Sequence, residues 1–364
     1  MTLKILITSA GGSGSNNLTD MLRNRFGTGV EIIGTHFDPF ELIKAESDHR
    51  YIVPRAKELE GYLAAHERLF AKHKVDVLIP NSDYEAAAFA SSPNPLTVHS
   101  ILPNADMVEA VQDKFHFHRI LDKAGCNAVK NVPISGPDAM EDAIAELNSD
   151  QEYYWIRARH GSGSIAATWL KTADQARKWM SLWYEMRGVP LTDYVIAPFL
   201  PGRDFCVSTM WQDGELCVGK AYERLSYMGS AVTLSEMGSA PKTARSIADA
   251  EPIETGMMAI RAVCDAFNVK PHGFFQADLK CDSAGKPFVT EINIGRFPQT
   301  ITHFDLVGEH SFAEMYVKLA MDPNADLPRG VYDFSDPTIF CRAFDMKVRV
   351  APESELDDLK KAIA

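Results

Sequence analysis

The chain of 364 residues is 46% hydrophobic and 24% charged, as expected for a soluble globular protein with two or three domains and a large core. Its formal net charge of −12 argues against nucleic acid as the main partner, because proteins that bind the phosphate backbone normally carry a basic excess. The sequence has no apolar run of about 18 residues, so we expect no membrane span. The cysteines are scattered and no basic leader precedes the first apolar run, so the expected location is the cytoplasm.

The first hundred residues alternate strand and helix patterns. Short apolar runs at 3–8, 30–35 and 75–79 are separated by helical patterns, which predicts a parallel sheet with both faces covered. Asp83 and Glu85 follow the third run, near the carboxyl edge of the sheet where ligands tend to bind. They either touch a substrate or cap the next helix, and the sequence leaves both interpretations open.

A glycine-rich loop at 9–15 follows the first apolar run. It fits the dinucleotide fingerprint poorly, because position 17 is Asn where a glycine is needed, although a small anion at the following helix remains an alternative. Asp38 stands before Pro39 and is interpreted as a helix cap with proline in the first helical position.

The middle of the chain begins with two predicted helices within 104–125, the second running from 112 to 124. Strands are predicted at 153–158 and 165–170, joined by a glycine-rich tip at 159–164, and a helix at 173–184. Such a tip can close over phosphates with its backbone N–H groups, helped by Arg157, or it can simply be a flexible turn.

The second half of the chain is richer in predicted strands. We expect them at 193–199, 204–212 and 216–223, and then a loop at 225–247, which lacks periodicity. The tight turn at 199–204 can offer backbone groups to an adenine edge, with Asp204 accepting from ribose. A helix is expected at 250–267, before the hairpin described next. After that hairpin we expect a helix at 309–321, a strand at 337–349 and a charged C-terminal helix.

The most informative stretch lies between residues 274 and 296. Oxygen-bearing side chains recur at every second position, so Gln276 and Asp278 share one strand face, as do Glu291 and Asn293. A polar turn at 282–287 lets the two strands pair, which would gather two carboxylates and an amide oxygen on one surface. Such a hard-oxygen set suits Mg²⁺; the alternative is a hairpin with a polar solvent face.

Taken together, these elements resemble the ATP-grasp superfamily, and most closely its branch that is similar to the carbamoyl-phosphate synthase large chain and to carboxylate–amine ligases. The resemblance implies an α/β chain with a Rossmann-like parallel sheet at 1–103, a helical linker and lid at 104–195, and a two-part α+β grasp fold that ends in a core with the metal site at 196–364. It departs from many relatives at Ala197, where they carry a carboxylate, and at the run from Asn293 to Arg296, where they carry Asn-Pro-Arg.

The resemblance also implies roles for individual residues. The nucleotide ATP and Mg²⁺ are the expected cofactors, with Mn²⁺ as a substitute. Residues similar to the family's nucleotide contacts are Lys114, Arg157, Gly161, Ser162, Gly163, Ser164, Phe199, Leu200 and Asp204. Residues that match the magnesium triad are Asp278, Glu291 and Asn293. The arginines expected to act on transferred phosphate are Arg296, Arg224 and Arg157.

The implied reaction has two steps, in which ATP phosphorylates a carboxylate and an amine then displaces phosphate. The expected partners are therefore a small-molecule carboxylate and an amine, and analogy suggests a homodimer. A non-ligating ATP-binding or regulatory protein, and an ATP-grasp kinase or carboxylase, are the alternatives. The sequence does not name the acid or the amine.

Overall fold

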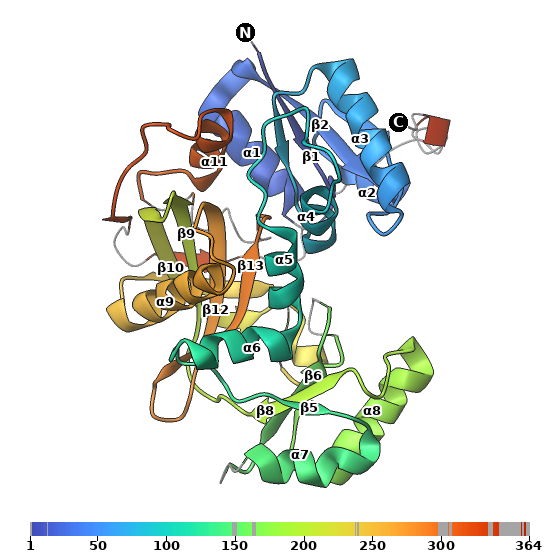
Figure 1. The fold of residues 1–364 in the computed structure, drawn as a ribbon, viewed down its shortest axis with the longest axis vertical. Coiled ribbons are helices and arrows are strands. Elements are labelled where there is room, and N and C mark those ends of the chain that lie inside the picture. Colours follow the sequence, from blue (N-terminus) through green and yellow to red (C-terminus); the bar gives the residue numbers. More distant parts are fainter. Residues whose placement is uncertain are drawn as a thin grey trace.

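Three β-sheets organise the chain in this computed structural model (Figure 1). The structure describes residues 2–12, 14–147, 151–161, 165–236, 238, 240–297, 305, 308–333, 338–341, 358, 360 and 361. In Figure 1 the N-terminal sheet lies at one end of the molecule, the sheet that carries β6 and β8 at the other, and the largest sheet between them. Within the described residues, every helix is too short or too polar to cross a bilayer.

The N-terminal sheet is fully parallel and has the strand order β3-β2-β1-β4. Its strands are β1 (Leu3–Ile7), β2 (Val30–His36), β3 (His49–Ile52) and β4 (Val77–Ile79). Its helices are α1 (Ser15–Phe26), α2 (Pro39–Lys44), α3 (Leu59–His73) and α4 (Asp83–Ala90). Neighbouring residues on one strand enter different apolar clusters, as Ile5 and Leu6 do, so both faces are covered as predicted.

Two helices then lead away from this sheet, α5 (Ala105–Gln112) and α6 (Lys114–Lys123). Asn104 caps α5 by accepting from the backbone N–H of Met107. Asp113 caps α6 in the same way, which is why α6 begins at Lys114 and not at residue 112 as the sequence pattern predicted. Asp38 likewise caps α2, with Pro39 in the first helical position, as expected.

The second sheet is antiparallel and has the strand order β5-β8-β6-β7. Its elements are β5 (Val132–Ile134), α7 (Met140–Leu147), β6 (Tyr154–Ala158), β7 (Thr168–Leu170), α8 (Ala173–Arg187) and β8 (Tyr194–Pro198). Strands β6 and β7 pair antiparallel as predicted, although β7 begins three residues later than expected, and residues 162–164 of the glycine-rich segment between them lie outside the described residues. Because β8 crosses residue 195, the predicted boundary there divides a strand; the three-part division itself stays a prediction.

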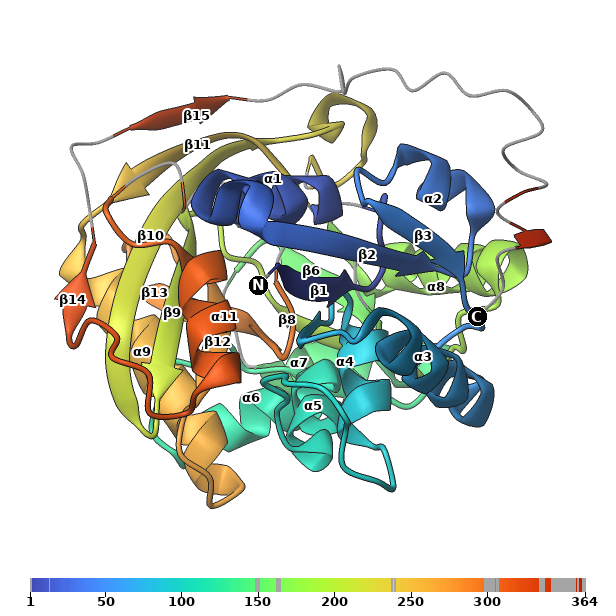
Figure 2. The same cartoon turned by 90° about the horizontal axis from the view of Figure 1, so that it is seen from above.

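The central sheet has the order β13-β12-β9-β10-β11-β15, with β14 beside β10. Its elements are β9 (Asp204–Gln212), β10 (Glu215–Tyr227), β11 (Pro241–Ile247), α9 (Ala250–Ala266), β12 (Gly273–Cys281), β13 (Pro287–Ile294), α11 (Phe312–Met321), β14 (Val331–Tyr332) and β15 (Ile339–Cys341). Helix α9 packs against β9, β12 and β13, whereas α11, beside this sheet in Figure 2, contacts β9, β12 and α1.

The predicted loop at 225–247 is partly wrong. Strand β10 continues to Tyr227, and β11 pairs with both β10 and β15. The polar composition of β11 kept the sequence pattern from indicating a strand. Ser246 is buried, and its hydroxyl accepts a hydrogen bond from the backbone N–H of Thr338. A polar residue therefore occupies a position where an apolar residue would have indicated burial. The predicted last strand is described only as β15, and most of the predicted C-terminal helix lies outside the described residues.

Candidate active site

The predicted hairpin is present, with the register that the sequence pattern requires. Asp278 on β12 lies directly opposite Glu291 on β13, and Gln276 lies opposite Asn293. A bulge inserts Thr290 beyond this pair, and its hydroxyl donates to the carbonyl of Asp278 over 3.0 Å. Cβ atoms of such cross-strand partners lie about 4.5–5.5 Å apart, so the structure brings the three predicted metal ligands onto one face.

Alternation along β12 explains why this face is polar at one end only. Ala277 and Leu279 point into the apolar cluster under α9, whereas Phe274 points to the opposite face and into the cluster around α11. Gln276 and Asp278 continue that second face beyond the reach of α11, where it borders a cavity. A single face of the strand therefore packs against the core at one end and lines the cavity at the other.

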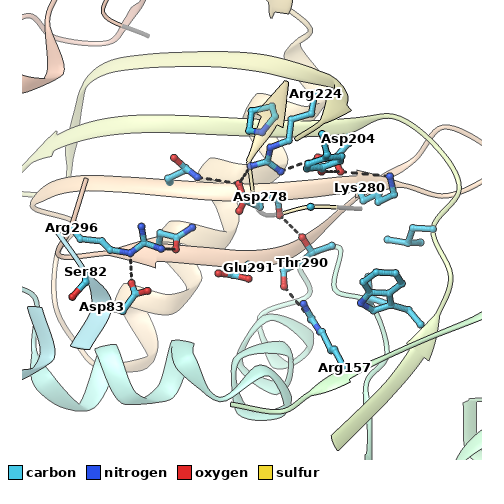
Figure 3. Close-up of a pocket in the computed structure, with 18 of the residues that line it drawn as sticks. Ser82, Asp83, Arg157, Asp204, Arg224, Asp278, Lys280, Thr290, Glu291 and Arg296 are labelled. Atoms are coloured by element: carbon cyan, nitrogen blue, oxygen red, sulfur yellow. Dashed lines mark hydrogen bonds and ion pairs between the residues drawn. The ribbon is translucent and has the colours of Figure 1, made fainter. Parts of the chain in front are cut away.

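The cavity has a volume of about 660 Å³, within the usual range for small-molecule sites. All three sheets contribute to its walls. The N-terminal sheet supplies the loops after β2 and β4, the second sheet supplies Arg157 and the end of β8, and the central sheet supplies the acidic hairpin. Figure 3 shows Asp278, Glu291 and Arg296 facing this space.

One end of the cavity is apolar. Trp155, Ala197 and Leu200 line it together with Val129 and Phe199. Phe199 and Leu200 are the two residues that the resemblance associates with adenine, and both line the cavity. Ala197 is buried and brings no carboxylate, in line with the departure noted in the sequence.

Arg224 connects two acidic residues of the cavity wall. Its Nη1 lies 2.9 Å from Asp204 Oδ1, and its Nη2 donates to Asp278. Burial alone would lower the pKa of Arg224, but the two carboxylates outweigh it and raise the pKa well above its usual range. Asp204 also accepts from the hydroxyl of Tyr227 over 2.5 Å and lies 3.5 Å from Lys280 Nζ, so its carboxylate is already engaged by three side chains.

Arg296 spans the two sides of the cavity. Its Nε donates to Asp83, the first residue of α4, and its Nη2 lies 2.5 Å from Asn293 Oδ1. Gly295 makes this reversal, with φ +71° and Pro103 so close that a Cβ would lie 2.6 Å from its Cδ. The positive φ and the contact with Pro103 therefore explain why a glycine precedes Arg296.

Asp83 and Glu85, for which the sequence left two interpretations, differ in the structure. The cap of α4 is Ser82, which accepts from the backbone N–H of Glu85 over 3.3 Å. Asp83 lines the cavity. Glu85 points inward, where the hydroxyls of Thr8 and Ser9 each donate to it over 2.7 Å, and burial raises its pKa. The substrate interpretation is thus compatible with Asp83 and not with Glu85.

Glu291 is the carboxylate least engaged by its neighbours. No hydrogen bond from another described residue reaches it, and burial raises its pKa while Lys114 and Arg157 oppose that shift. Arg157 places Nη2 3.3 Å from the carbonyl of Thr290 and 3.4 Å from His118 Nε2. Among the described cavity residues, several buried polar atoms lack a partner: Arg157 Nε, His118 Nδ1, Asn131 Oδ1 and Gln276 Oε1. These atoms and a carboxylate without a hydrogen-bond donor fit a site for a cation and a polar ligand.

Lys114 is not among the residues that line the large cavity. It borders a small adjoining cavity of about 40 Å³ with Gly161 and Glu291, and its Nζ donates to the carbonyl of Gly161 over 2.6 Å. Burial lowers the pKa of Lys114 to about 8. The structure thus brings Lys114 to the base of the glycine loop and not into the wall of the large cavity. Ser162, Gly163 and Ser164 lie outside the described residues.

Sequence reasoning missed two cavity histidines. His118 follows Lys114 by four residues on α6, so the helical repeat alone indicates that both share a face. His36 ends β2, and its Nδ1 accepts from the backbone N–H of Asp38 over 2.8 Å. Its position at the carboxyl edge of a parallel strand was the available signal.

No family model and no curated protein sequence matches the chain. Its fold, however, is similar to that of many solved structures. An L-amino acid ligase from Bacillus licheniformis is 13% identical, with a TM-score of 0.62, and the match covers 90% of this chain and 78% of that one. The biotin carboxylase domain of a 2-oxoglutarate carboxylase from Hydrogenobacter thermophilus, solved as a dimer with ADP, MgADP and bicarbonate, is 12% identical with a TM-score of 0.70, over 94% of this chain and 75% of that one.

A third similar structure is an N5-carboxyaminoimidazole synthetase from Staphylococcus aureus in complex with ADP. It is 12% identical with a TM-score of 0.65, and the match covers 93% of this chain and 82% of that one. At such low identity, the likeness concerns the fold and not the activity. The likeness extends over most of this chain, so the chain shares the overall fold of these proteins, in agreement with the ATP-grasp fold that the sequence predicted.

Proposed function

We propose that the protein is an ATP-dependent carboxylate–amine ligase. The γ-phosphoryl group of ATP is transferred to a carboxylate oxygen, which gives an acyl phosphate and ADP. The amine nitrogen then attacks the acyl carbon, phosphate leaves with the C–O bond electrons, and the amine proton passes to solvent. The observation that carries the proposal is the cross-strand pair of Asp278 and Glu291, with Asn293 beside it, at the polar end of a cavity whose other end is apolar.

The acidic hairpin supports the first half of this reaction. Asp278, Glu291 and Asn293 would hold Mg²⁺, which when bound neutralises charge on the β- and γ-phosphates. Their positions on paired strands favour a fixed geometry, because neither carboxylate depends on a loop. Phosphoryl transfer relies mainly on positioning and charge neutralisation, so this arrangement supplies what the step needs.

The arginines support the second half. Arg296 lies beside Asn293 and reaches Asp83 across the cavity, so its guanidinium can stabilise charge on an acyl phosphate that forms between the two sheets. Arg157 lies on the opposite wall, near Glu291, and would offset phosphate charge from the lid side. Arg224 contacts Asp278 directly and would act by holding this carboxylate in place.

A screen for ADP release tests the proposal. Stripped, untagged protein is incubated with MgATP and pairs drawn from amino acids and other carboxylic acids and amines, with the Glu291→Gln variant as the blank. The proposed reaction requires one acid and one amine together, and equal amounts of ADP, phosphate and an amide product by mass spectrometry. ADP release that depends on bicarbonate, or a stable phosphorylated product without an amine, would contradict the ligase proposal in favour of a carboxylase or kinase.

Three finer expectations remain proposals of ours. Mn²⁺ should replace Mg²⁺ in this assay, because both cations accept oxygen ligands. The analogy with a dimeric fold neighbour suggests a homodimer, which light scattering can test. A cytoplasmic setting agrees with six cysteines that form no disulfide in the described structure, and fractionation of the native host tests it.

A further inference from the structure

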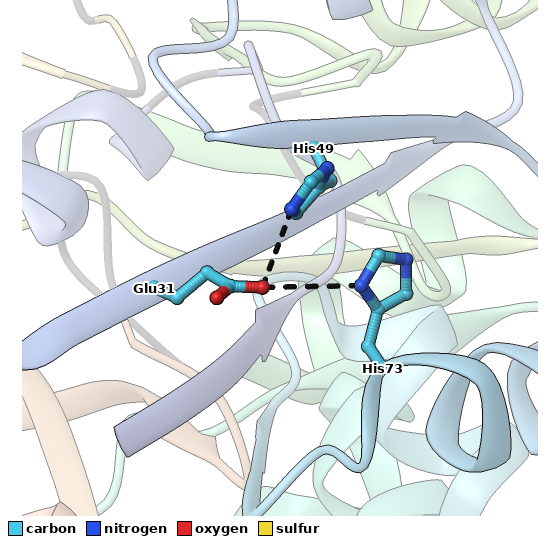
Figure 4. Close-up of side chains that lie close together, drawn as sticks. All are labelled: Glu31, His49 and His73. Carbon is cyan, nitrogen blue, oxygen red and sulfur yellow. Dashed lines mark ion pairs between the residues drawn. The ribbon is translucent and has the colours of Figure 1, made fainter. Parts of the chain in front are cut away.

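A second group of ligand-type side chains lies far from the cavity, at the amino end of β2. Glu31 on β2, His49 on β3 and His73 at the end of α3 place one ligand atom each within 4.8 Å of one another (Figure 4). In the described part of the chain, this is the one such group of three or more histidine, cysteine or acidic side chains. The large cavity lies at the carboxyl end of the same strand, so the two sites are separated by the length of β2.

We infer that Glu31, His49 and His73 form a binding site for a divalent transition metal of the Zn²⁺ type. Two imidazoles and one carboxylate are ligands that zinc accepts, at bond lengths of about 2.0–2.2 Å. Tetrahedral ligands at such lengths lie about 3.3 Å from one another. Glu31 Oε1 is 3.2 Å from His49 Nε2 and 3.9 Å from His73 Nδ1, so both pairs are close to the required spacing.

The elements that carry the three ligands hold them in place. His49 pairs with Ile33, two residues after Glu31, so Glu31 and His49 lie on the same face of neighbouring parallel strands. That face is covered by α3, whose Leu69 and Phe70 join the apolar cluster beneath it. His73 follows on the same helix, which brings its ring over the edge of the sheet.

A fourth side chain orients one of the ligands. The hydroxyl of Tyr51 lies 2.8 Å from His73 Nε2, on the ring nitrogen that faces away from Glu31. This contact fixes which nitrogen of His73 is offered to a metal, as the outer partners of metal-bound histidines do. Burial lowers the pKa of His73, which favours the neutral imidazole that a metal needs.

The site is partly open to solvent. The side chain of His49 is 44% exposed, whereas that of His73 is only 10% exposed. Three protein ligands and an exposed side leave a fourth position for water or an external group. Lys4 Nζ lies 4.0 Å from Glu31 Oε1, and a bound dication would repel this ammonium into solvent. The site joins β2, β3 and α3, so we assign it a stabilising role, independent of the proposed ligase reaction.

Zinc titration of the untagged, chelator-stripped chain tests the inference. The titration is run by calorimetry with excess Mg²⁺, the cation proposed for the acidic hairpin, and is repeated with Co²⁺ to record ligand-field absorption. We expect one equivalent of Zn²⁺ to bind with micromolar or tighter affinity, an intense tetrahedral Co²⁺ spectrum, and a rise in Tm with Zn²⁺. His49→Ala and His73→Ala should each weaken binding at least a hundredfold, and Tyr51→Phe by about 10–100-fold.

His272→Ala is the matched control. His272 is also a surface histidine beside a carboxylate, with Nδ1 3.1 Å from Asp213, but it has no third ligand within reach among the described residues. This variant should bind Zn²⁺ as the parent does. Zinc binding that survives His49→Ala, or that needs millimolar Zn²⁺ in the parent, would overturn the inference. Because His49 is exposed, an unchanged metal-free Tm of its variant rules out misfolding as the cause of lost binding.

Discussion

Two of the walls of the large cavity are built differently. On the central-sheet wall, Asp278 and Glu291 occupy paired strand positions, and their directions follow from strand alternation. On the N-terminal wall, His36 and Asp83 come at or just after the ends of parallel strands, where the chain turns into a helix. The first wall is fixed by backbone register, and the second by turns whose length and shape can vary.

This difference suggests a division of labour between the walls. Groups that must meet a phosphate chain and a cation belong on the rigid wall, because phosphoryl transfer depends on exact positioning. Groups that choose the acid or the amine belong on the variable wall. Arg296 connects the two, since it contacts Asn293 on one wall and Asp83 on the other.

The largest expected effect comes from Glu291→Gln on the rigid wall. Loss of this carboxylate should lower turnover by about a thousandfold or more, because a proposed ligand of Mg²⁺ disappears. Steady-state ADP release measures it, and circular dichroism and Tm should stay close to the parent values. Glu215→Gln, an exposed position at the start of β10, is the control and should keep full activity. Full activity of Glu291→Gln would disprove the metal assignment.

Removal of Arg224 should act on stability as much as on activity. Its side chain is only 11% exposed, and Arg224→Met leaves Asp204 and Asp278 facing each other without their shared cation. We expect a loss of about 3 kcal/mol in the free energy of unfolding, measured with denaturant and partly recovered by Mg²⁺. Arg245→Met removes a 43%-exposed partner of Glu223 and should cost about 1 kcal/mol or less. Equal costs for the two variants would argue against a special role of Arg224.

Lys114 predicts a pH dependence. Its pKa is lowered to about 8 by burial, so its ammonium is present below that pH and is lost as pH rises through it. If the ammonium helps to bind ATP, kcat/KM for ATP should fall about tenfold between pH 7 and 9, the change expected for one group of this pKa. Lys114→Arg should remove this fall, because arginine stays charged. A parent profile that is flat up to pH 9 would exclude Lys114 from nucleotide binding.

The same contrast between the walls governs what could be predicted from the sequence. The register of Asp278 and Glu291 was predictable, because a period of two along both strands left few alternatives. The inward direction of Glu85 was not, because it depends on hydroxyls of Thr8 and Ser9 more than seventy residues away. Strand β11 was not predicted for a related reason. Its buried Ser246 is stabilised by a hydrogen bond from Thr338, a distant residue, and not by apolar packing that the sequence pattern would have shown.

The smallest expected effect lies on the variable wall, at His36. The Nδ1 atom of His36 accepts from the backbone N–H of Asp38, and its ring centroid lies 4.6 Å from that of Phe37. Burial lowers the pKa of His36, so its imidazole stays neutral at pH 7. A neutral ring held in this way can shape a subsite without adding charge. His36→Ala should therefore raise KM for the acid or the amine by about tenfold, the equivalent of one lost contact of about 1.4 kcal/mol.

The KM for ATP should not change in this variant, because the proposed nucleotide contacts come from the second and central sheets and not from the N-terminal wall. His99→Ala, an exposed histidine outside the cavity, is the control and should leave both constants unchanged. A His36 variant that weakens ATP and the second substrate equally would show that the two walls act as one site. The division of labour would then have to be abandoned, even if the hairpin still holds the cation.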